Sequence, residues 1–370
     1  MKILLVRLRL IGDVVLTTPL LRALKRTYPA AQLTYLVEPE AAPVVRGNPH
    51  LTNVMRVPRR RGIARLRDDL AIARELRRER FDVAIDLHGG PRAAWFAWAS
   101  RAPMRIGYAI KGRSWMYTHV VPRTADDAPR ATVLNQWDLL APLAIAPPDR
   151  ARDPLVMVEE GEAAATVERR LRDARITAAH PLIVIHVSAG NPFRRWPRES
   201  FESLVVALAR RDPLRRIILT SGPSDAAAAA AIADRARAAL GSLAAAVPDV
   251  GDFDLAELRA LVARAAVYIG GDSGPLHIAG TTTTPIVAVL GPTLAERSMP
   301  WRDPRWFAEA LDVGPLECRP CRQRECIPGD FRCLTQITAD QVAAAAERAL
   351  KGSGLITVRE MSPDPMTRSV

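Results

Sequence analysis

A short segment, residues 270–277, gathers residue types that are suited to binding a diphosphate. An apolar run at 266–269 precedes it and predicts a buried strand, which Gly270 and Gly271 would end in a turn. A polar residue can then cap a helix that has Pro275 at its first position. Glycines let a ligand approach the backbone, and the N–H groups at a helix start attract anions. A plain strand-to-helix turn is the alternative. The residues predicted to contact the ligand are Asp272, Ser273, Gly274 and His277.

A second set of candidate phosphate ligands follows the strand predicted at 182–187. The loop after this strand carries Ser188, Arg194 and Arg195, and Trp196 with Pro197 restrains it. Arginine binds phosphate oxygens in pairs, so this loop suits the same diphosphate, with surface solvation of both arginines as the alternative. Asp225 closes the next turn, at 221–225, after a strand predicted at 216–220, and joins this set.

Asp13 is the candidate general base. It follows the first predicted strand, residues 2–6, and opens a helix predicted over 14–27. An aspartate here can either cap the helix or take a proton from a hydroxyl group at the edge of a site. Segment 86–90 follows another predicted strand and is expected at the same edge of the sheet.

Basic residues are concentrated in the first half of the chain. Residues 56–80 hold ten arginines and four acidic residues. The helix arginines suit a solvated face, whereas a loop triplet beside the sheet suits a rim that receives phosphate groups. The candidate residues of this rim, which would bind the acceptor under the resemblance described below, are Arg59, Arg60, Arg61, Arg92 and Arg113.

The four cysteines lie within sixteen residues of one another. In a chain expected in the cytoplasm, such clustering favours a metal site over disulfides. Two interpretations remain open: structural zinc held by four thiolates, or reduced and packed thiols. The candidate ligands are Cys318, Cys321, Cys326 and Cys333.

Strands that alternate with helices position these residues. This order predicts an α/β protein built from doubly wound parallel sheets, with ligands at the carboxyl ends of the strands. Proline-rich sequence between residues 142 and 154 marks a junction. We predict a first domain at 1–165, a second at 175–350 and a disordered tail at 356–370.

Composition narrows the classes of function. The net charge of +12 favours partners that carry phosphate, whether nucleic acid, nucleotides or an anionic membrane surface. The aromatic content is 5%, and motifs of nucleic-acid-binding proteins are absent, so nucleic acid is a poor fit. The phosphate-binding loop of nucleoside triphosphatases and the dinucleotide fingerprint are absent as well. Because no long uncharged apolar run occurs, we expect a cytoplasmic protein that at most lies on a membrane.

Four motifs in order resemble glycosyltransferase family 9, the ADP-heptose:lipopolysaccharide heptosyltransferases. The resemblance spans residues 1–350. It rests on Gly12-Asp13-Val14 with Pro19, on His186 with the run from Arg194 to Phe201, on the run from Gly271 to Ala279, and on Gly291-Pro292-Thr293. The cysteine cluster also resembles one in many members of this family.

The resemblance implies a GT-B architecture, in which two Rossmann-like domains face each other across a cleft. It implies that a nucleotide-sugar, ADP-heptose, binds the C-terminal domain and that a Kdo–lipid A type acceptor binds the N-terminal one. Asp13 would act as base in an inverting displacement, with no cofactor required and with the protein peripheral on an anionic inner membrane. Arg194 replaces the usual lysine, and Asp225 matches the usual acidic position only loosely.

Two other functions stay open. One is a GT-B enzyme with another nucleotide-sugar or acceptor, such as an epimerase-like protein. The other is a non-enzymatic basic protein that binds membranes or nucleic acid.

Overall fold

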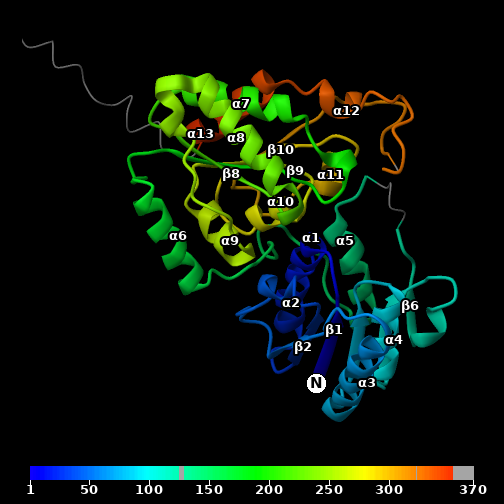
Figure 1. Cartoon of the computed structure of the whole chain (residues 1–370). Coiled ribbons are helices and arrows are strands. Elements are labelled where there is room, and N and C mark those ends of the chain that lie inside the picture. Colours follow the sequence, from blue (N-terminus) through cyan, green and yellow to red (C-terminus); the bar gives the residue numbers. More distant parts are fainter. Residues whose placement is uncertain (125–128, 322, 353–370) are drawn as a thin grey trace, which may run out of the picture. The chain divides into compact units, whose positions relative to one another are not determined.

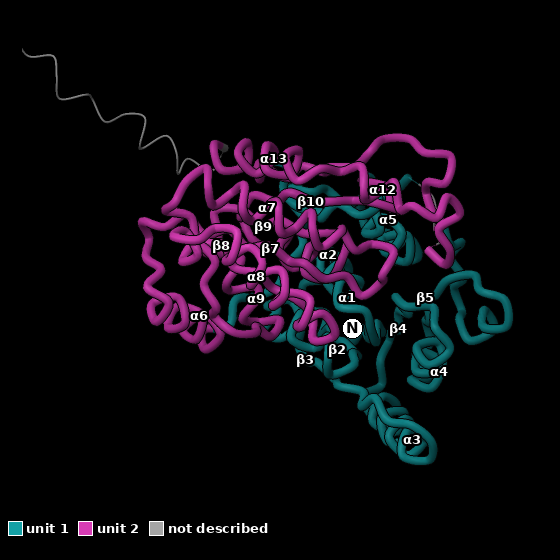
Figure 2. The backbone as a smooth tube through the Cα atoms, turned by 45° about the horizontal axis from the view of Figure 1, so that its top comes forward, with its two compact units in different colours: residues 1–160, 296–304 teal, residues 161–295, 305–370 magenta. Residues whose placement is uncertain are grey.

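The computed structural model describes residues 1–124, 129–321 and 323–352, and it divides into two compact units (Figure 2). The first unit contains Met1–Glu160 and Glu296–Pro304, and the second contains Gly161–Ala295 and the chain from Arg305 onward. The junction therefore lies between Glu160 and Gly161, and nothing in the sequence signalled that a segment returns to the first unit. The tail predicted at 356–370 lies outside the described residues.

The first unit is built on a parallel sheet of six strands in the order β3-β2-β1-β4-β5-β6 (Figure 1). Side chains Ile3 to Val6 of the central strand are fully buried, as the apolar run at the start of the chain predicts. The strands are β1 (Lys2–Val6), β2 (Gln32–Val37), β3 (Asn53–Arg56), β4 (Val83–Asp86), β5 (Met104–Tyr108) and β6 (His119–Val121).

Helices cover both faces of this sheet. Helix α4 packs on β1 and β4, and α3 packs on α4, whereas α2 packs against α5. The helices are α1 (Ile11–Val15), α2 (Thr18–Thr27), α3 (Gly62–Glu79), α4 (Pro91–Ala99) and α5 (Thr132–Trp137). Across the described residues, no helix combines the length and the apolar character that a membrane span needs.

The helix predicted over residues 14–27 is wrong in one respect, because the structure has two helices there. Pro19 has no N–H to donate to the carbonyl of Val15, four residues earlier. The hydroxyl of Thr18 donates to that carbonyl instead, at 2.7 Å, and the hydroxyl of Thr17 donates to Val14 at 2.7 Å. The chain therefore breaks between α1 and α2 without leaving these buried carbonyls unpaired.

The second unit is built on a parallel sheet of five strands in the order β11-β10-β9-β7-β8. These strands are β7 (Leu182–His186), β8 (Arg216–Thr220), β9 (Val267–Gly271), β10 (Ile286–Val289) and β11 (Ala308–Leu311). Helices α7, α8 and α13 form one packed group, and α6, α9 and α10 form another. The helices are α6 (Gly161–Asp173), α7 (Arg198–Arg211), α8 (Ala226–Leu240), α9 (Leu255–Ala263), α10 (Gly274–Ala279), α12 (Arg332–Thr335) and α13 (Ala339–Gly352). Helix α11 (Ala295–Ser298) lies at the boundary, with all but its first residue in the first unit.

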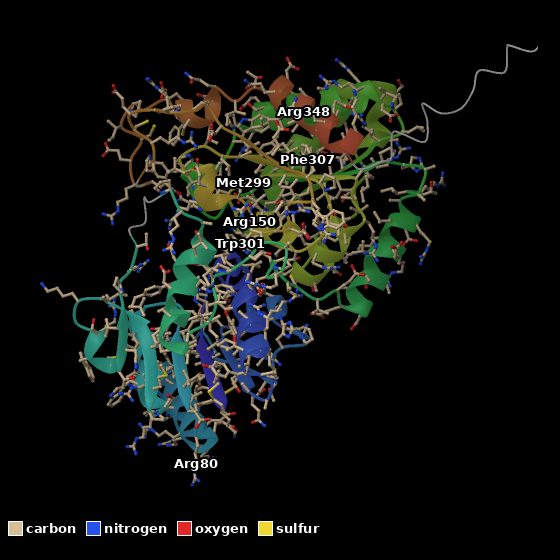
Figure 3. The ribbon with its side chains drawn as sticks, turned by 180° about the vertical axis from the view of Figure 1, so that it is seen from behind. Arg80, Arg150, Met299, Trp301, Phe307 and Arg348 are labelled. Atoms are coloured by element: carbon tan, nitrogen blue, oxygen red, sulfur yellow. The ribbon has the colours of Figure 1, made fainter. Side chains whose placement is uncertain are left out.

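The segment at 296–304 belongs to the first unit through contacts of Trp301. Its indole N–H donates to the carbonyl of Asp153 at 3.0 Å, and its own carbonyl accepts from the N–H of Leu155 at 3.1 Å. The guanidinium of Arg150 lies over its ring, 4.8 Å from the centroid (Figure 3). Trp301 thus fastens the returning segment to the end of the first unit's chain.

Each sheet has a position where the strand order reverses. In the first unit, β1 pairs with β2 on one side and with β4 on the other. In the second unit, β7 pairs with β8 on one side and with β9 on the other. Ligands of doubly wound proteins bind beyond the carboxyl ends of the strands at such a position. Asp13, His88, Arg194 and Asp272 follow β1, β4, β7 and β9, respectively.

Candidate functional site

In the second unit, Arg194 connects the loop after β7 with the loop after β9. Its Nη1 lies 3.0 Å from an Asp272 carboxylate oxygen, and its Nε donates to the side-chain carbonyl of Gln323 at 2.6 Å. The Asp272 side chain is 8% exposed and that of Arg194 is 31% exposed. The guanidinium is therefore fixed in orientation while part of it still faces solvent, which suits a group that receives an anion.

The two glycines predicted to form a turn lie instead inside β9, paired with β10. A Cβ atom at Gly270 would lie 2.7 Å from the hydroxyl oxygen of Tyr268, and one at Gly271 would lie 3.3 Å from the carbonyl oxygen of Arg194. The glycines are therefore required by close approach within the strand. The missing side chain at Gly271 is what allows the backbone of the Arg194 loop to lie against β9.

Ser188, Arg195 and Asp225 form a separate polar cluster in the second unit. The hydroxyl of Ser188 donates to Asp225 at 2.6 Å, and Nη2 of Arg195 lies 3.1 Å from the other carboxylate oxygen. Asp225 and Ser188 are both buried. Both carboxylate oxygens of Asp225 thus contact neighbouring side chains. Asp225 thereby positions Ser188 and Arg195 at the carboxyl ends of β7 and β8.

Two buried hydroxyl groups lie at the ends of β9 and β10. Among the described residues, the Ser273 and Thr293 hydroxyl oxygens have no hydrogen-bond partner. Ser273 is the residue before α10, yet its side chain makes no capping hydrogen bond. A buried hydroxyl without a partner is costly, so both are poised for water or a ligand oxygen. Asp272 and His277, the other predicted residues of this segment, are buried beside them.

His186, the last residue of β7, lies directly beneath these loops. Its ring Nδ1 and the Thr220 hydroxyl are 3.0 Å apart, and the side chain is buried. Burial lowers the pKa of His186 to about 4, and the nearby Asp225 carboxylate opposes this shift. The ring is therefore neutral near pH 7 and contributes no charge to a bound phosphate.

In the first unit, Asp13 does not cap its helix. Helix α1 begins at Ile11 after Leu10, which makes no side-chain capping hydrogen bond, and Asp13 lies in the first turn. Nη2 of Arg7 donates to an Asp13 carboxylate oxygen, and Nη1 of Arg7 donates to the carbonyl of Leu87 at 2.6 Å. The Asp13 side chain remains 26% exposed. Arg7 thus holds the carboxylate in place without covering it, which is compatible with the predicted role as a base.

Asp86, at the end of β4, is buried beside this pair. One carboxylate oxygen accepts from the N–H groups of His88 and Gly89 at 2.8 and 2.9 Å, and the other accepts from the Tyr117 hydroxyl at 2.6 Å. Burial raises the pKa of Asp86, and these hydrogen bonds and Arg7 oppose the shift. Burial, aided by Arg7, lowers the pKa of His88 to about 4. A Cβ atom at Gly107 would lie 2.3 Å from the Tyr117 ring, so that glycine allows Tyr117 to reach Asp86.

The predicted acceptor-binding arginines have different environments. Arg59, Arg60 and Arg61 are exposed in the loop between β3 and α3, and Arg60 lies 3.4 Å from Asp68. Arg113 lies after β5 and its Nε is buried; no described residue accepts from it. Arg92 differs from the other four. Its side chain is 12% exposed, and it pairs with Asp69 at 2.6 Å and Glu38 at 3.2 Å. Arg92 is therefore a mostly buried cation, and its acceptor-binding role stays a prediction.

The four cysteines are reduced and partly buried. They are close enough that Cys318, Cys326 and Cys321 each raise the pKa of Cys333, after the larger effect of burial. Among the described residues, no group of three or more His, Cys, Asp or Glu side chains is placed to hold a metal ion. As placed, the thiols do not fit a tetrahedral zinc site, and zinc binding stays a prediction.

Three residues that contact the predicted ones were missed. Gln323 is 129 residues from Arg194, in the cysteine segment, and no pattern in the sequence indicates that contact. Tyr117 is 31 residues from Asp86 and equally unmarked. Arg7 could have been found, because it is the first basic residue after the central strand and therefore lies at the ligand edge of the sheet.

Comparison with known proteins agrees with this arrangement. The family model for glycosyltransferase family 9 (heptosyltransferase) matches residues 70–331. A lipopolysaccharide heptosyltransferase 3 of Escherichia coli is 26% identical over 359 residues, which are 94% of this chain and 98% of that protein. A family 9 glycosyl transferase structure from Veillonella parvula superposes with a TM-score of 0.79 at 23% identity, covering 95% of this chain and 97% of that one. The structure of the E. coli ADP-heptose lps heptosyltransferase II superposes with a TM-score of 0.74 at 20% identity, covering 95% of this chain and 99% of that chain. The predicted fold class, α/β of GT-B type with two Rossmann-like units, is confirmed.

The depressed pKa of His186 predicts a loss of stability in acid. The unfolded chain takes up a proton on this ring below pH 6.5, whereas the folded protein does so only near pH 4. The stability contributed by the neutral ring is complete above pH 6.5 and is lost as the pH falls to about 4. We expect wild type to lose about 2–3 kcal/mol between pH 7 and 4.5 through this residue. His186→Asn should lose correspondingly less, as measured by urea unfolding at both pH values. His119→Asn, at an exposed position, is the control, and equal pH slopes for all three proteins would contradict the assignment.

Proposed function

Because this chain belongs to glycosyltransferase family 9, the heptosyltransferases, we propose that it transfers heptose from ADP-heptose to the inner core of a lipopolysaccharide precursor of the Kdo–lipid A type. The lipopolysaccharide heptosyltransferase 3 and the ADP-heptose lps heptosyltransferase II to which it is similar support both the donor and the acceptor class. The observation that carries the proposal is the fixed but partly exposed guanidinium of Arg194 beside Asp272 and the unpartnered hydroxyl of Ser273.

The second unit binds the nucleotide-sugar in this proposal. The diphosphate lies at the carboxyl ends of β7 and β9, where Arg194 and the backbone N–H groups near Ser273 and Gly274 meet it. The Ser273 hydroxyl donates to a phosphate oxygen and so gains the partner that it lacks. Negative charge grows on the diphosphate as the bond to the sugar breaks. The same groups therefore stabilise the transition state more than the bound donor, and no metal ion is required.

The first unit binds the acceptor, and Asp13 acts as the base. An acceptor hydroxyl oxygen attacks the anomeric carbon of the heptose from the side opposite the diphosphate. The new C–O bond forms as the bond to ADP breaks, and ADP leaves with both electrons. Asp13 takes the proton of the attacking hydroxyl. A single displacement of this kind inverts the anomeric centre. Arg7, which holds the Asp13 carboxylate through one oxygen, positions the base.

The exposed loop from Arg59 to Arg61 is proposed to receive the acidic groups of the acceptor. It follows β3, the edge strand on one side of β1, and Arg113 follows β5, two strands along on the other side. Strands β3 and β5 each lie about 10 Å from β1 along the sheet, since neighbouring strands are about 4.8 Å apart. Basic groups on both sides of Asp13 suit an acceptor that carries several phosphate or carboxylate groups.

We predict that Arg194→Ala weakens ADP binding about tenfold to a hundredfold, since charged hydrogen bonds contribute roughly 1.5–3 kcal/mol. Calorimetric titration with ADP measures the effect. Arg194→Lys, which keeps the charge, should lose less, and Arg169→Ala at an exposed position of α6 should lose nothing. Unchanged affinity in the alanine variant would show that Arg194 does not contact the diphosphate.

We predict that Asp13→Asn abolishes heptose transfer but leaves ADP binding nearly unchanged. The amide keeps the shape of the side chain but cannot accept the proton, and general base catalysis contributes about 10²–10⁴-fold. The measurement is transfer rate with saturating donor, together with ADP affinity. A rate within a few-fold of wild type would rule out Asp13 as the base.

We predict that replacing Arg59, Arg60 and Arg61 by Ser raises the apparent KM for the acceptor and flattens its salt dependence. Fewer charges then remain for salt to screen. Initial rates against an acceptor stripped of its acyl chains, at two salt concentrations, test this. ADP affinity should not change, because Arg194 belongs to the other unit. If variant and wild type share one salt slope, the acceptor does not bind at this loop.

A further inference from the structure

Helix α3 presents an apolar stripe to solvent. Ile63, Leu66 and Leu70 are 72%, 61% and 49% exposed, although burying such side chains is the usual gain of folding. Their spacing of three and four residues places them on one side of the helix. Exposed apolar residues are unremarkable one by one, but three neighbours on a single helix form a patch that marks an interaction surface.

A different side of α3 faces the unit's interior. Asp69, Ala73 and Leu76 are the buried residues of the helix, and Leu76 belongs to the core beneath it. Arg92 of α4 pairs with Asp69, and Nε of Arg77 donates to the carbonyl of Ala99 at 3.0 Å. The helix is therefore fastened to α4 along its length, and the exposed stripe is not what holds it in place.

The charges on α3 are sorted around its axis. Arg67 lies four residues after Ile63, and Arg74 lies four residues after Leu70. Each arginine is therefore one helical turn from a residue of the apolar stripe and borders it. The acidic residues Asp68, Glu75 and Glu79 are spaced by seven and four, and they share a side away from the stripe. The side of the helix that carries the apolar stripe is therefore basic, and the acidic residues lie on the opposite side.

We propose that α3 lies in the headgroup layer of an anionic membrane, with Ile63, Leu66 and Leu70 entering the acyl boundary and Arg67 and Arg74 on lipid phosphates. An apolar stripe bordered by arginines is the pattern of helices that lie in a membrane interface. A second copy of this chain fits less well, because pairing two such faces would bring their arginines together. Figure 2 shows α3 at the outer edge of the first unit, and Figure 3 places Arg80 at its outer end.

This binding does not depend on the proposed function, although it would bring the enzyme to an acceptor that is anchored in lipid. The two can be separated experimentally. Transfer to an acceptor without acyl chains should be the same in wild type and in variants of the stripe. Vesicle binding, in contrast, should be the same with and without nucleotide-sugar.

Co-sedimentation of the full chain with vesicles tests the proposal. Vesicles of phosphatidylcholine alone are compared with vesicles of equal parts phosphatidylcholine and phosphatidylglycerol. We expect wild type to bind the anionic vesicles and to be released by salt. The variant Ile63→Ser/Leu66→Ser/Leu70→Ser should bind about tenfold or more weakly, because its apolar insertion is lost. Arg67→Gln/Arg74→Gln should lose about tenfold or more, since each arginine near the surface contributes about fivefold.

Matched changes elsewhere serve as controls. Ile327→Ser removes an apolar side chain that is 86% exposed in the second unit, and Arg169→Gln/Arg172→Gln removes two exposed charges from α6. Both should bind vesicles like wild type, and all variants should keep the wild-type melting temperature. Failure of wild type to bind anionic vesicles, or equal binding by the stripe variant, would overturn the proposal. So would a dimer of wild type that the stripe variant lacks, because the stripe would then be covered by a second copy.

Discussion

Parallel pairing of β7 with β9 is the constraint on which the proposed diphosphate site of the second unit depends. The two strands are consecutive in the sheet but lie far apart in the chain, and their pairing runs from Ile183 with Val267 to His186 with Gly270. Both strands therefore end at the same level, and the loops that follow them must meet. The ion pair between Arg194 and Asp272 is the side-chain consequence of that backbone register. Gly271 completes it, because a larger residue would press on the Arg194 loop.

The first unit repeats the same solution with different chemistry. There β1 pairs with β4, and the loops after them bring Asp13, Arg7 and the Asp86 group together. A carboxylate held by one arginine and open to solvent suits proton transfer, whereas an arginine held by one carboxylate suits anion binding. Each unit thus has an arginine–aspartate ion pair beyond its sheet. The more exposed partner is the aspartate, Asp13, in the first unit and the arginine, Arg194, in the second. The division of labour between donor and acceptor in the proposed reaction follows from this difference.

Residue patterns predicted the parallel sheets of both units, and the features that they did not predict have physical reasons. Strands β1 and β8 were predicted with their observed bounds, because buried parallel strands are continuous apolar runs in the sequence. Asp13, Arg194 and Asp272 were predicted as site residues because each follows such a run. The break between α1 and α2 depends on a hydroxyl replacing a proline's missing N–H, which no periodicity reports. The ion pairs of Arg92 were not predicted, because its partners, Glu38 and Asp69, come from two other segments. Gln323 could not be found at all, since only the folded chain brings the cysteine segment to Arg194.

The segment from Glu296 to Pro304 has a further consequence for how the two units are joined. The chain passes between them three times, after Glu160, after Ala295 and after Pro304. A protease cut after Glu160 would break the covalent link between Met1–Glu160 and the rest of the chain. The hydrogen bonds of Trp301 with Asp153 and Leu155 would still join the two fragments. An uninterrupted stretch of sequence that contains all of one unit also contains part of the other. A stretch that avoids the other unit lacks one of the unit's own two segments. A gene fusion that exchanges the first unit between relatives would therefore have to carry two separate pieces, the second of them only a few residues around Trp301.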